Sequence, residues 1–321
     1  MDHRALPVAA GYAQVDGQVD AQVDAQVDAQ VELAPLLRRA RERLAAAGVP
    51  SPAADVDRLA AHALGVPPGE AAAVALRGAR VDAATAHALE ELVDARADRV
   101  PLQHLTGRAP FRTVELAVGP GVFVPRPETE VVAGLAVEEA GALADAVRAP
   151  LVVDLCTGSG AIAVAVAVEV PAARVVAVEL DPLAHAWARR NVDALAPRVD
   201  LRLGDAVRAH AGVLADLAGV VDVVVTNPPY IPDDARPVDP EVADHDPHPA
   251  LYGGGTDGLD VPRGVVAAAA GLLRAGGLLV MEHGDSQGPA ARRLAAGPGW
   301  HDVRTADDLT GRPRALLARR G

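Results

Sequence analysis

Lysine does not occur in this chain of 321 residues, and all 30 of its basic residues are arginines. This absence excludes a catalytic lysine that forms a Schiff base and the lysine of a phosphate-binding P-loop, and with them two large classes of enzyme. The chain also has a single cysteine, Cys156. It therefore has neither an intramolecular disulfide nor a zinc site built from several cysteines.

Aromatic residues and long apolar runs are scarce as well. Two Trp, three Tyr and two Phe stand against a hydrophobic content of 50%, so the core must be built from Ala, Val and Leu. The longest uncharged apolar run, residues 264–273, is half the length that a membrane span needs. Residues 1–13 are too short and too weakly apolar for a signal peptide, and we therefore expect a cytoplasmic protein.

The charge balance is acidic, with 43 Asp and Glu against 30 Arg and a formal net charge of −13. A protein of this charge lacks the global basic surface that nucleic-acid binding usually requires. We therefore expect neither nucleic acid nor a membrane as a direct partner.

The chain divides into four segments by composition. Residues 1–32 carry a Gln-Val-Asp-Ala repeat and are expected to form a low-complexity extension, disordered or marginally helical. Residues 33–99 have apolar residues at helical spacing and predict a small domain of three or four helices that binds a partner or positions the next domain. Residues 100–127 are rich in Pro and Gly and predict a linker of loops with a short hairpin. Residues 128–321 form the main domain.

This main domain alternates short Val-rich strands with helices, which is typical of an α/β fold whose sheet is parallel and has crossover helices. The strands are expected at residues 151–155, 174–180, 199–203, 220–226 and 278–283. Residues 301–307 and 314–319 can add an antiparallel hairpin.

The first of these strands leads into a glycine-rich turn, Asp154-Leu155-Cys156-Thr157-Gly158-Ser159-Gly160, and a helix follows directly. Glycines at this spacing let the backbone turn tightly and approach a ligand at the helix N-terminus. Glu179 ends the second strand, where a carboxylate can accept hydrogen bonds from two ribose hydroxyls. The pattern fits a dinucleotide-dependent dehydrogenase and an adenosyl-methionine site equally well, and a tight turn without a ligand is a third interpretation. Cys156 is predicted to be a small buried hydrophobe rather than a nucleophile, because no histidine lies near it in the sequence.

The fourth strand distinguishes these possibilities, because it ends in Asn227-Pro228-Pro229-Tyr230. Two prolines after a buried strand end its pairing and fix an extended backbone. The Asn227 side-chain oxygen and the Pro228 carbonyl can both accept hydrogens from a planar –NH2 group, and the ring of Tyr230 can stack on that group. A dehydrogenase has no need of this element, whereas an enzyme that methylates an amino or amide nitrogen does.

A possible metal site is the segment Asp244-His245-Asp246-Pro247-His248. Pro247 breaks the regular spacing that metal ligands need, so we expect a solvated loop and no metal.

Together these motifs resemble a known family. The glycine-rich turn and Asn227-Pro228-Pro229-Tyr230 are similar to those of class I methyltransferases that use S-adenosyl-methionine and modify nitrogen. Two further motifs narrow the resemblance to the release factor glutamine methyltransferases, the HemK family: Gln103-His104-Leu105-Thr106-Gly107, and Phe123-Val124-Pro125-Arg126-Pro127-Glu128-Thr129-Glu130. The helical segment and the tail at residues 308–314 fit the same family, so that the resemblance runs from about Leu33 to the C-terminus.

The resemblance implies a Rossmann-like, mostly parallel seven-stranded sheet with helices on both faces, preceded by a small all-α domain that docks the substrate. It implies S-adenosyl-L-methionine as the cofactor, and methyl transfer to the N5 amide nitrogen of the glutamine in the Gly-Gly-Gln motif of peptide chain release factors. Asn227, Pro228 and Tyr230 would act in catalysis, and Pro229 and Arg126 would also contact the acceptor. The cofactor would be bound by Phe123, Cys156, Thr157, Gly158, Ser159, Gly160, Glu179, Asp205 and Asn227.

Three positions depart from the family pattern. Cys156 stands where glycine is common, and its small size should be tolerated. Ala206 stands where some members carry an aromatic residue, so adenine should be stacked less. The turn Gly253–Gly258 is one residue longer than usual and is assigned no role. Arg126 also has a second interpretation, as an ion-pair partner of Glu128 or Glu130.

The acceptor stays open at this point. A glutamine in another protein, such as a ribosomal protein, and the N6 of adenine in DNA would undergo the same chemistry. The acidic charge and the short helical domain argue against DNA. A binding protein that keeps the fold without turnover is the alternative from another class.

Overall fold

The computed structural model describes residues 30–146 and 149–321, which divide into one unit ending at Asp98 and another beginning at Arg99. Most of the repeat segment lies outside the described residues. Its last two residues, Val31–Glu32, form strand β1, which pairs with β2 (Arg80–Val81). Strand β1 therefore lies within the segment that was expected to form the low-complexity extension. The repeat pattern could not predict this, because the partner strand lies about fifty residues away.

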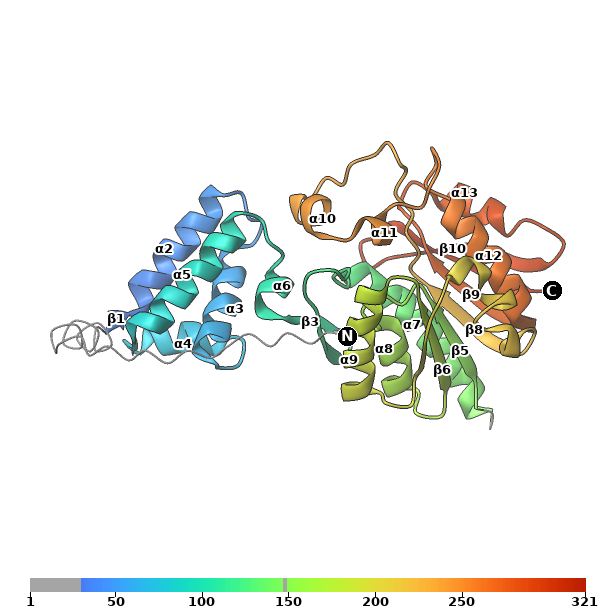
Figure 1. Ribbon diagram of the computed structural model, residues 1–321, viewed down its shortest axis with the longest axis horizontal. Helices are drawn as coiled ribbons and strands as arrows, with labels where there is room; N and C mark the ends of the chain where they lie inside the picture. The colour runs from blue at the N-terminus through green and yellow to red at the C-terminus, as the bar shows by residue number, and fades with distance from the viewer. Residues whose placement is uncertain (1–29, 147–148) are drawn as a thin grey trace, which may run out of the picture. The chain divides into compact units, whose positions relative to one another are not determined.

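The first unit contains the helices that the apolar spacing predicts (Figure 1). They are α2 (Leu33–Ala46), α3 (Pro52–Leu64), α4 (Glu70–Leu76) and α5 (Ala83–Ala97). Gly65 ends α3 with a φ of 64°, a conformation that favours glycine. Asp82 begins α5 by accepting a hydrogen bond from the backbone N–H of Thr85 at 2.7 Å. A buried ion pair between Asp55 and Arg96, at 2.8 Å, joins α3 to α5.

The second unit begins with a helix and a hairpin and continues as alternating strands and helices. The first part consists of α6 (Leu102–Thr106), β3 (Arg108–Phe111), β4 (Val114–Ala117) and α7 (Pro127–Asp145). The alternating part consists of β5 (Leu151–Leu155), α8 (Ala161–Glu169), β6 (Arg174–Glu179), α9 (Pro182–Leu195), β7 (Asp200–Leu203), η1 (Ala206–Ala211), η2 (Ala215–Leu217), β8 (Val221–Thr226), α10 (Pro240–His245), α11 (His248–Leu251), α12 (Asp260–Leu272), β9 (Leu273–Glu282), α13 (Gly288–Leu294), β10 (Trp300–Asp307) and β11 (Pro313–Arg320).

The central sheet of this unit has seven strands in the order β10-β11-β9-β8-β5-β6-β7. The five strands from β9 to β7 run parallel, and β11 is antiparallel to both of its neighbours. The predicted fold class is therefore confirmed. The strand order reverses between β5 and β8, and the carboxyl ends of parallel strands at such a point are where α/β proteins bind ligands.

Two apolar layers cover the sheet, one on each face. Helices α7, α8 and α9 pack with the β3–β4 hairpin on one face. The segments η1, η2, α12 and α13 pack on the other face (Figure 1). Every residue of β5 and β8 is buried, as expected for central parallel strands covered on both faces.

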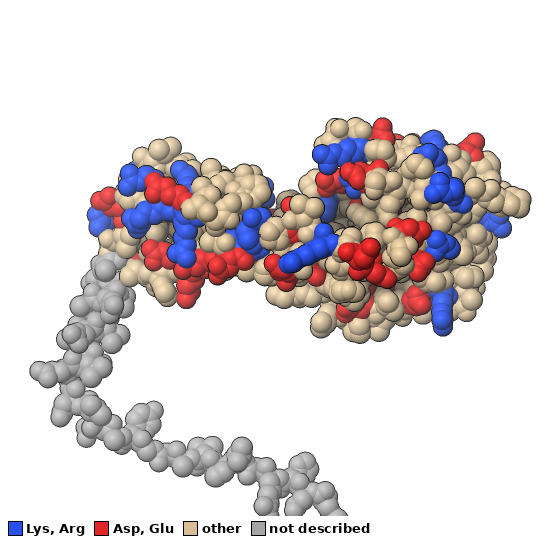
Figure 2. All heavy atoms as spheres, turned by 90° about the horizontal axis from the view of Figure 1, so that it is seen from above, with Lys and Arg blue, Asp and Glu red and all other residues tan. Residues whose placement is uncertain are grey.

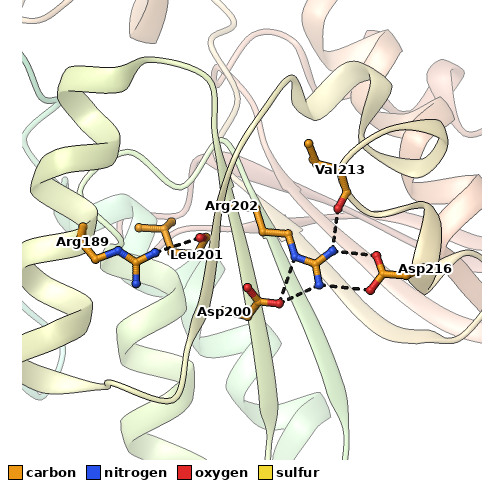
Figure 3. Close-up of polar contacts among 6 residues, drawn as sticks. All are labelled: Arg189, Asp200, Leu201, Arg202, Val213 and Asp216. Carbon is orange, nitrogen blue, oxygen red and sulfur yellow. Dashed lines mark hydrogen bonds and ion pairs between the residues drawn. The ribbon is translucent and has the colours of Figure 1, made fainter.

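Strand β7 forms one edge of the sheet, and two arginines stabilise it, Arg202 within the strand and Arg189 on α9 (Figure 3). The Arg202 guanidinium donates hydrogen bonds of 2.6–3.2 Å to Asp200, Val213 and Asp216. Arg189 on α9 donates to the Leu201 carbonyl at 3.0 Å. These bonds occupy polar groups of an edge strand and fix its carboxyl end, which Asp205 follows.

One predicted strand boundary is wrong. Strand β9 was expected at residues 278–283 and instead begins at Leu273. The early residues include Gly276, whose φ is +76°, and Gly277, which together suggest a turn in the sequence. Leu273 pairs with Val221 and Leu278 with Val223, so the glycines lie in an irregular, bulged stretch of the strand between these two pairs. Pairing with β11 begins only at Leu278.

The surface of the described residues carries charges of both signs. On the face seen in Figure 2, both signs occur on each unit, and acidic side chains form a row along the lower edge of the first unit. Within the described ranges, no helix is long and apolar enough to cross a membrane.

Candidate active site

A cavity of about 460 Å³ lies at the carboxyl ends of β5, β6 and β8, within the second unit. Among the residues that the sequence singled out for the site, all but Gly160 and Pro228 line this cavity. They are Phe123, Arg126, Cys156, Thr157, Gly158, Ser159, Glu179, Asp205, Asn227, Pro229 and Tyr230. The fold thus brings together residues from five separate segments of the chain.

The turn after β5 is held by backbone bonds and by glycine conformations. Gly158 and Gly160 have φ values of +58° and +84°, which glycine adopts without strain. A Cβ on Gly158 would meet nothing within 4 Å, whereas one on Gly160 would lie 3.6 Å from Ala188 on α9. Gly158 therefore leaves open space at the cavity, whereas at Gly160 it is the positive φ, and not the spacing to α9, that favours glycine.

Asp154 stabilises this turn from beneath, a role that the sequence did not reveal. Its carboxylate accepts hydrogen bonds from the Thr157 hydroxyl at 2.5 Å and from the backbone N–H of Ala163 at 3.1 Å. Asp154 is fully buried, and burial raises its pKa to about 7. The signal available in the sequence was an Asp near the end of an apolar strand, three residues before a Thr.

Asn191 on α9 also holds this turn in place. Its side-chain amide donates to the carbonyls of Ser159 and Ala117, both at 2.9 Å, and its oxygen accepts from the Ala117 N–H at 2.7 Å. The turn is therefore tied to β4 as well as to β5 before any ligand binds.

The backbone of Cys156 is strained, and the small size of the side chain does not relieve this strain. Its φ is +59°, in the left-handed region where a non-glycine residue is strained by about 1 kcal/mol. Burial raises the pKa of its thiol, and the nearby carboxylates of Glu179 and Asp154 raise it further. Both effects disfavour the thiolate and argue against nucleophilic chemistry at Cys156.

The Glu179 carboxylate lies across the glycine turn at the end of β6. It accepts hydrogen bonds from the backbone N–H groups of Gly158 (2.7 Å), Leu180 (2.8 Å) and Asp181 (2.9 Å). Burial raises its pKa, while these three donors oppose the shift. Asp205, after β7, accepts from the Val207 N–H at 2.9 Å and lines the same cavity.

Phe123 and Arg126 meet at another wall of the cavity. The Arg126 guanidinium carbon lies 5.0 Å from the centre of the Phe123 ring. Arg126 donates to Asp246 at 2.6 Å, so its ion-pair partner is neither Glu128 nor Glu130. Asp246 is buried, and burial raises its pKa although Arg126 lowers it.

In the segment 244–248, which suggested a metal site, two of the possible ligands contact other side chains. Asp246 binds Arg126, and the ring of His248 stacks on Tyr252 at 4.2 Å. Within residues 30–146 and 149–321, no three His, Cys, Asp or Glu side chains gather as metal ligands do.

The Asn227–Tyr230 loop leaves β8 at the centre of the sheet. The Asn227 side-chain amide is half-buried and donates from Nδ2 to the Thr129 hydroxyl oxygen at 3.2 Å. The Tyr230 hydroxyl donates to Oε1 of Glu282 at 3.3 Å. Pro228 is buried, whereas Pro229 and Tyr230 face the cavity. The Asn227 Oδ1 and the Tyr230 ring are thus available to a ligand.

Two family models match the chain, the PrmC N-terminal domain over residues 35–107 and the methyltransferase small domain over residues 140–241. A curated relative from Streptomyces coelicolor, named release factor glutamine methyltransferase, is 51% identical and covers 88% of this chain and 96% of its own length. The chain belongs to the release factor glutamine methyltransferase family.

Other members of the release factor glutamine methyltransferase family are similar over comparable lengths. The one from Mycobacterium tuberculosis is 43% identical over 86% of this chain and 88% of its own. The one from Deinococcus radiodurans is 40% identical over 90% and 99%. Among solved structures, a 16S rRNA methyltransferase from T. thermophilus, in complex with AdoMet and guanosine, is 22% identical, with a TM-score of 0.47, over 67% of this chain and 50% of that one.

In this member of the release factor glutamine methyltransferase family, sequence reasoning missed Thr129 and Glu282. Thr129 was quoted only as part of a motif, and Glu282 only as part of a strand. Glu282 is 2% exposed, and burial raises its pKa to about 7. The charge of Arg314 and the hydrogen bond from the Tyr230 hydroxyl oppose the shift. Neither residue carries a local sequence signal, because their contacts join α7, β8 and β9.

The Gly253–Gly258 turn, which had no assigned role, packs directly on the Asn227–Tyr230 loop. A Cβ on Gly258 would lie 2.1 Å from the Tyr230 carbonyl oxygen. A Cβ on Gly253 would lie 2.0 Å from the Gly258 oxygen and 2.6 Å from that of Pro229. Glycine is therefore required at both positions so that the backbones can approach this closely.

Proposed function

We propose that this protein transfers a methyl group from S-adenosyl-L-methionine to the N5 amide nitrogen of the glutamine in the Gly-Gly-Gln motif of peptide chain release factors. The observation that carries the proposal is the Asn227–Tyr230 loop, which faces the same cavity as the glycine turn and Glu179. The shared name of the relatives, release factor glutamine methyltransferase, supports this choice of acceptor.

The residues around the cavity fit S-adenosyl-L-methionine. The buried Glu179 carboxylate can accept hydrogen bonds from the ribose hydroxyls, and the missing Cβ of Gly158 leaves room beside it. Ile162, Ala206 and Val207 provide apolar walls suited to an adenine ring. When bound, the cofactor supplies a methyl group activated by a positively charged sulfur.

The contribution of the chain to the reaction is to bind and orient the acceptor amide. An amide nitrogen is a poor nucleophile, because its lone pair is shared with the carbonyl group. Asn227 Oδ1 and the Pro228 carbonyl would accept the two amide hydrogens, and the Tyr230 ring would stack on the amide plane. Orientation of this kind exposes the nitrogen lone pair to the methyl group.

The proton leaves to water rather than to Tyr230. The Tyr230 hydroxyl already donates to Glu282, and burial raises its pKa, so it is not a base at neutral pH. The alkylated nitrogen is strongly acidic and needs no base of its own in the cavity.

Transfer of labelled methyl from S-adenosyl-L-methionine to purified release factor tests the proposal. We expect label on the wild-type factor and none on a factor whose Gly-Gly-Gln glutamine is changed to Ala. Label on both factors would place the reaction at another residue. No label on either factor, with cofactor binding intact in calorimetry, would refute the release factor as acceptor and direct the search to other glutamine-containing proteins.

A further inference from the structure

Gln287 is a half-buried side chain that is absent from the described residues lining the cavity and yet binds a loop that faces it. It lies between β9 and α13. Its Nε2 donates to the carbonyls of Tyr230 and Asp257, both at 2.8 Å. Its Oε1 accepts from the backbone N–H of Gly284 at 2.8 Å. An amide –NH2 group has two hydrogens, so the two carbonyls use its full capacity to donate.

These three bonds join segments that are far apart in the sequence. The first carbonyl belongs to the Asn227–Tyr230 loop and the second to the Gly253–Gly258 turn, while Gly284 lies in the turn after β9. Gln287 is anchored to that last turn, because its backbone N–H donates to the Gly284 carbonyl at 2.9 Å. Since β9 pairs with β8 on one side and β11 on the other, the side chain of Gln287 is held by the central sheet.

The Asn227–Tyr230 loop needs a donor from outside, because its two prolines have no N–H with which to bond the loop to its neighbours. The N–H groups that follow, those of Tyr230 and Ile231, both donate to the Leu251 carbonyl, at 3.1 and 2.9 Å. These bonds hold the loop by its N–H groups alone. The Tyr230 carbonyl accepts from Gln287, and without this bond a polar group beside the cavity would be left unpaired, which is unfavourable.

We propose that Gln287 is a positioning residue for methyl transfer, which fixes the Tyr230 carbonyl and thereby holds the Tyr230 ring and the Pro228 carbonyl where the acceptor amide binds. This inference rests on the proposed function. The Tyr230 carbonyl belongs to the peptide group that leaves Tyr230, so a change in its direction turns the backbone that carries the ring. Small displacements of groups that position a substrate strongly reduce rates. Gln287 therefore acts on the reaction through Tyr230.

Two substitutions remove the donor without a large change in size. Gln287→Glu keeps the shape of the side chain but turns a carboxylate oxygen, which can only accept, toward two carbonyl oxygens. Gln287→Met has an unbranched side chain of similar length and no polar hydrogen, so it removes the bonds without adding a charge. Gln103→Glu is the matched control. Gln103 on α6 is the other glutamine of the second unit and is absent from the described residues that line the cavity.

The position of the loop can be measured by NMR without turnover. The chain has two isoleucines, Ile231 directly after Tyr230 and Ile162 on α8. Labelling with nitrogen-15 isoleucine therefore gives two backbone N–H signals, which Ile231→Val assigns. The Ile231 nitrogen shares its peptide group with the Tyr230 carbonyl, so its signal responds directly to a bond lost at that carbonyl.

In both Gln287 variants, we expect the Ile231 signal to shift and its exchange with water to become about tenfold faster, because the loop opens more often. The Ile162 signal should stay unchanged, as should both signals in Gln103→Glu. An Ile231 signal that shifts in neither Gln287 variant would overturn the proposal, whatever the acceptor is.

The effect on the reaction is measured by methyl transfer to release factor. We expect kcat to fall about tenfold or more in both Gln287 variants and to stay unchanged in Gln103→Glu. The Kd for S-adenosyl-L-methionine, measured by calorimetry, should stay that of the wild type, because Gln287 bonds neither the glycine turn nor Glu179.

Two kinetic results would also overturn the proposal. A loss of cofactor affinity as large as the loss of kcat would show that the substitutions disturb the whole cavity. Full kcat in variants whose Ile231 signal does shift would show that the reaction does not depend on this bond. A wild-type enzyme that methylates no release factor would refute the proposed function instead, and the Ile231 signal would still decide whether Gln287 holds the loop.

Discussion

Asn227 combines a free side-chain oxygen at the cavity with an –NH2 group fixed by Thr129. Replacing it with Ala removes one preorganised acceptor from the site. We expect Asn227→Ala to lower kcat about 100-fold, a typical effect of removing one such hydrogen-bonding group. The measurement is steady-state methylation of release factor with saturating cofactor.

The melting temperature of Asn227→Ala should stay close to that of the wild type, because the side chain is half-buried and makes one bond to the protein. Full kcat in a folded variant would show that the amide is not positioned by Asn227.

Glu179 is expected to govern affinity for the cofactor rather than the rate of transfer. Glu179→Gln loses the charge that would accept from ribose hydroxyls, and it presents an –NH2 group to backbone donors that now lie at 2.7–2.9 Å from the carboxylate. Hydrogen bonds to charged groups contribute about 1.5–3 kcal/mol, so we expect the Kd for S-adenosyl-L-methionine to rise about 10- to 100-fold. Titration calorimetry measures this directly.

Asp193→Asn is the control for Glu179→Gln, because Asp193 is an exposed carboxyl on α9. Equal cofactor affinity in Glu179→Gln and the control would contradict a ribose-binding role for Glu179.

Residues that stand beside a strand end and a local motif could be singled out from the sequence, and residues whose importance depends on contacts with other elements could not. Glu179 ends β6 at the usual spacing after the glycine-rich turn, and Asn227 follows β8 directly before two prolines. Glu282 also ends a strand, but its significance depends on the Tyr230 hydroxyl from the loop after β8. Cys156 was judged by size, whereas its strain depends on a φ that the sequence does not reveal.

At the scale of elements, the Gly253–Gly258 turn is expected to support the Asn227–Tyr230 loop by close backbone packing. In Gly258→Ala, a Cβ 2.1 Å from the Tyr230 oxygen must push the two segments apart. We expect kcat/KM for release factor methylation to fall at least tenfold, because small displacements of positioning groups strongly reduce rates.

Gly219→Ala is a closely matched control for this substitution. Its φ of +71° nearly equals the +70° of Gly258, but its Cβ would meet nothing within 4 Å. In each variant the positive φ strains the backbone of the new alanine by about 1 kcal/mol. We therefore expect the melting temperature of both to fall by about 2–4 °C. Equal activity in the two variants would show that strain, and not the contact with Tyr230, is what matters.

The elements themselves were largely predictable, because buried parallel strands are short Val-rich runs bounded by turns. Strands β5 to β8 lie within one residue of their expected limits. Strand β9 exceeds its expected limit by five residues, since Leu273 pairs with Val221 of β8 ahead of the bulged stretch that contains Gly276 and Gly277. The strand order could not be read from local patterns, and the family resemblance implied only a mostly parallel seven-stranded sheet.

At the scale of the whole second unit, buried carboxyls make stability depend on pH. Burial raises the pKa of Asp154 and of Glu282 to about 7, above the usual values of 3.8 and 4.5. The folded state therefore holds these protons more tightly than the unfolded state does. Their contribution to stability is complete below about pH 4 and is lost as the pH rises through about 7.

Glutamine does not titrate, so we expect Glu282→Gln to lack the part of the pH-dependent fall in unfolding free energy that Glu282 causes. Between pH 5 and pH 8, the wild type should lose about 3 kcal/mol more of its unfolding free energy than Glu282→Gln loses. Urea denaturation followed by tryptophan fluorescence measures this, since Trp187 and Trp300 both belong to the second unit. Parallel pH profiles for the two proteins would show that Glu282 is not the titrating group.

Strand β11 follows β10 in the sequence but lies between β10 and β9 in the sheet. Among the described residues, β11 is the strand that joins β10 to the sheet. A ribosome makes the chain in order, so residues 300–307 are synthesised before any strand exists with which they can pair. The sheet can close at this edge only after residues 313–320 have been added and have inserted beside β9. Translation of this protein therefore passes through a stage in which five of the seven strands of its sheet can already pair while the edge strand β10 still lacks its partner. A chaperone or a codon-dependent pause would act most strongly at this stage.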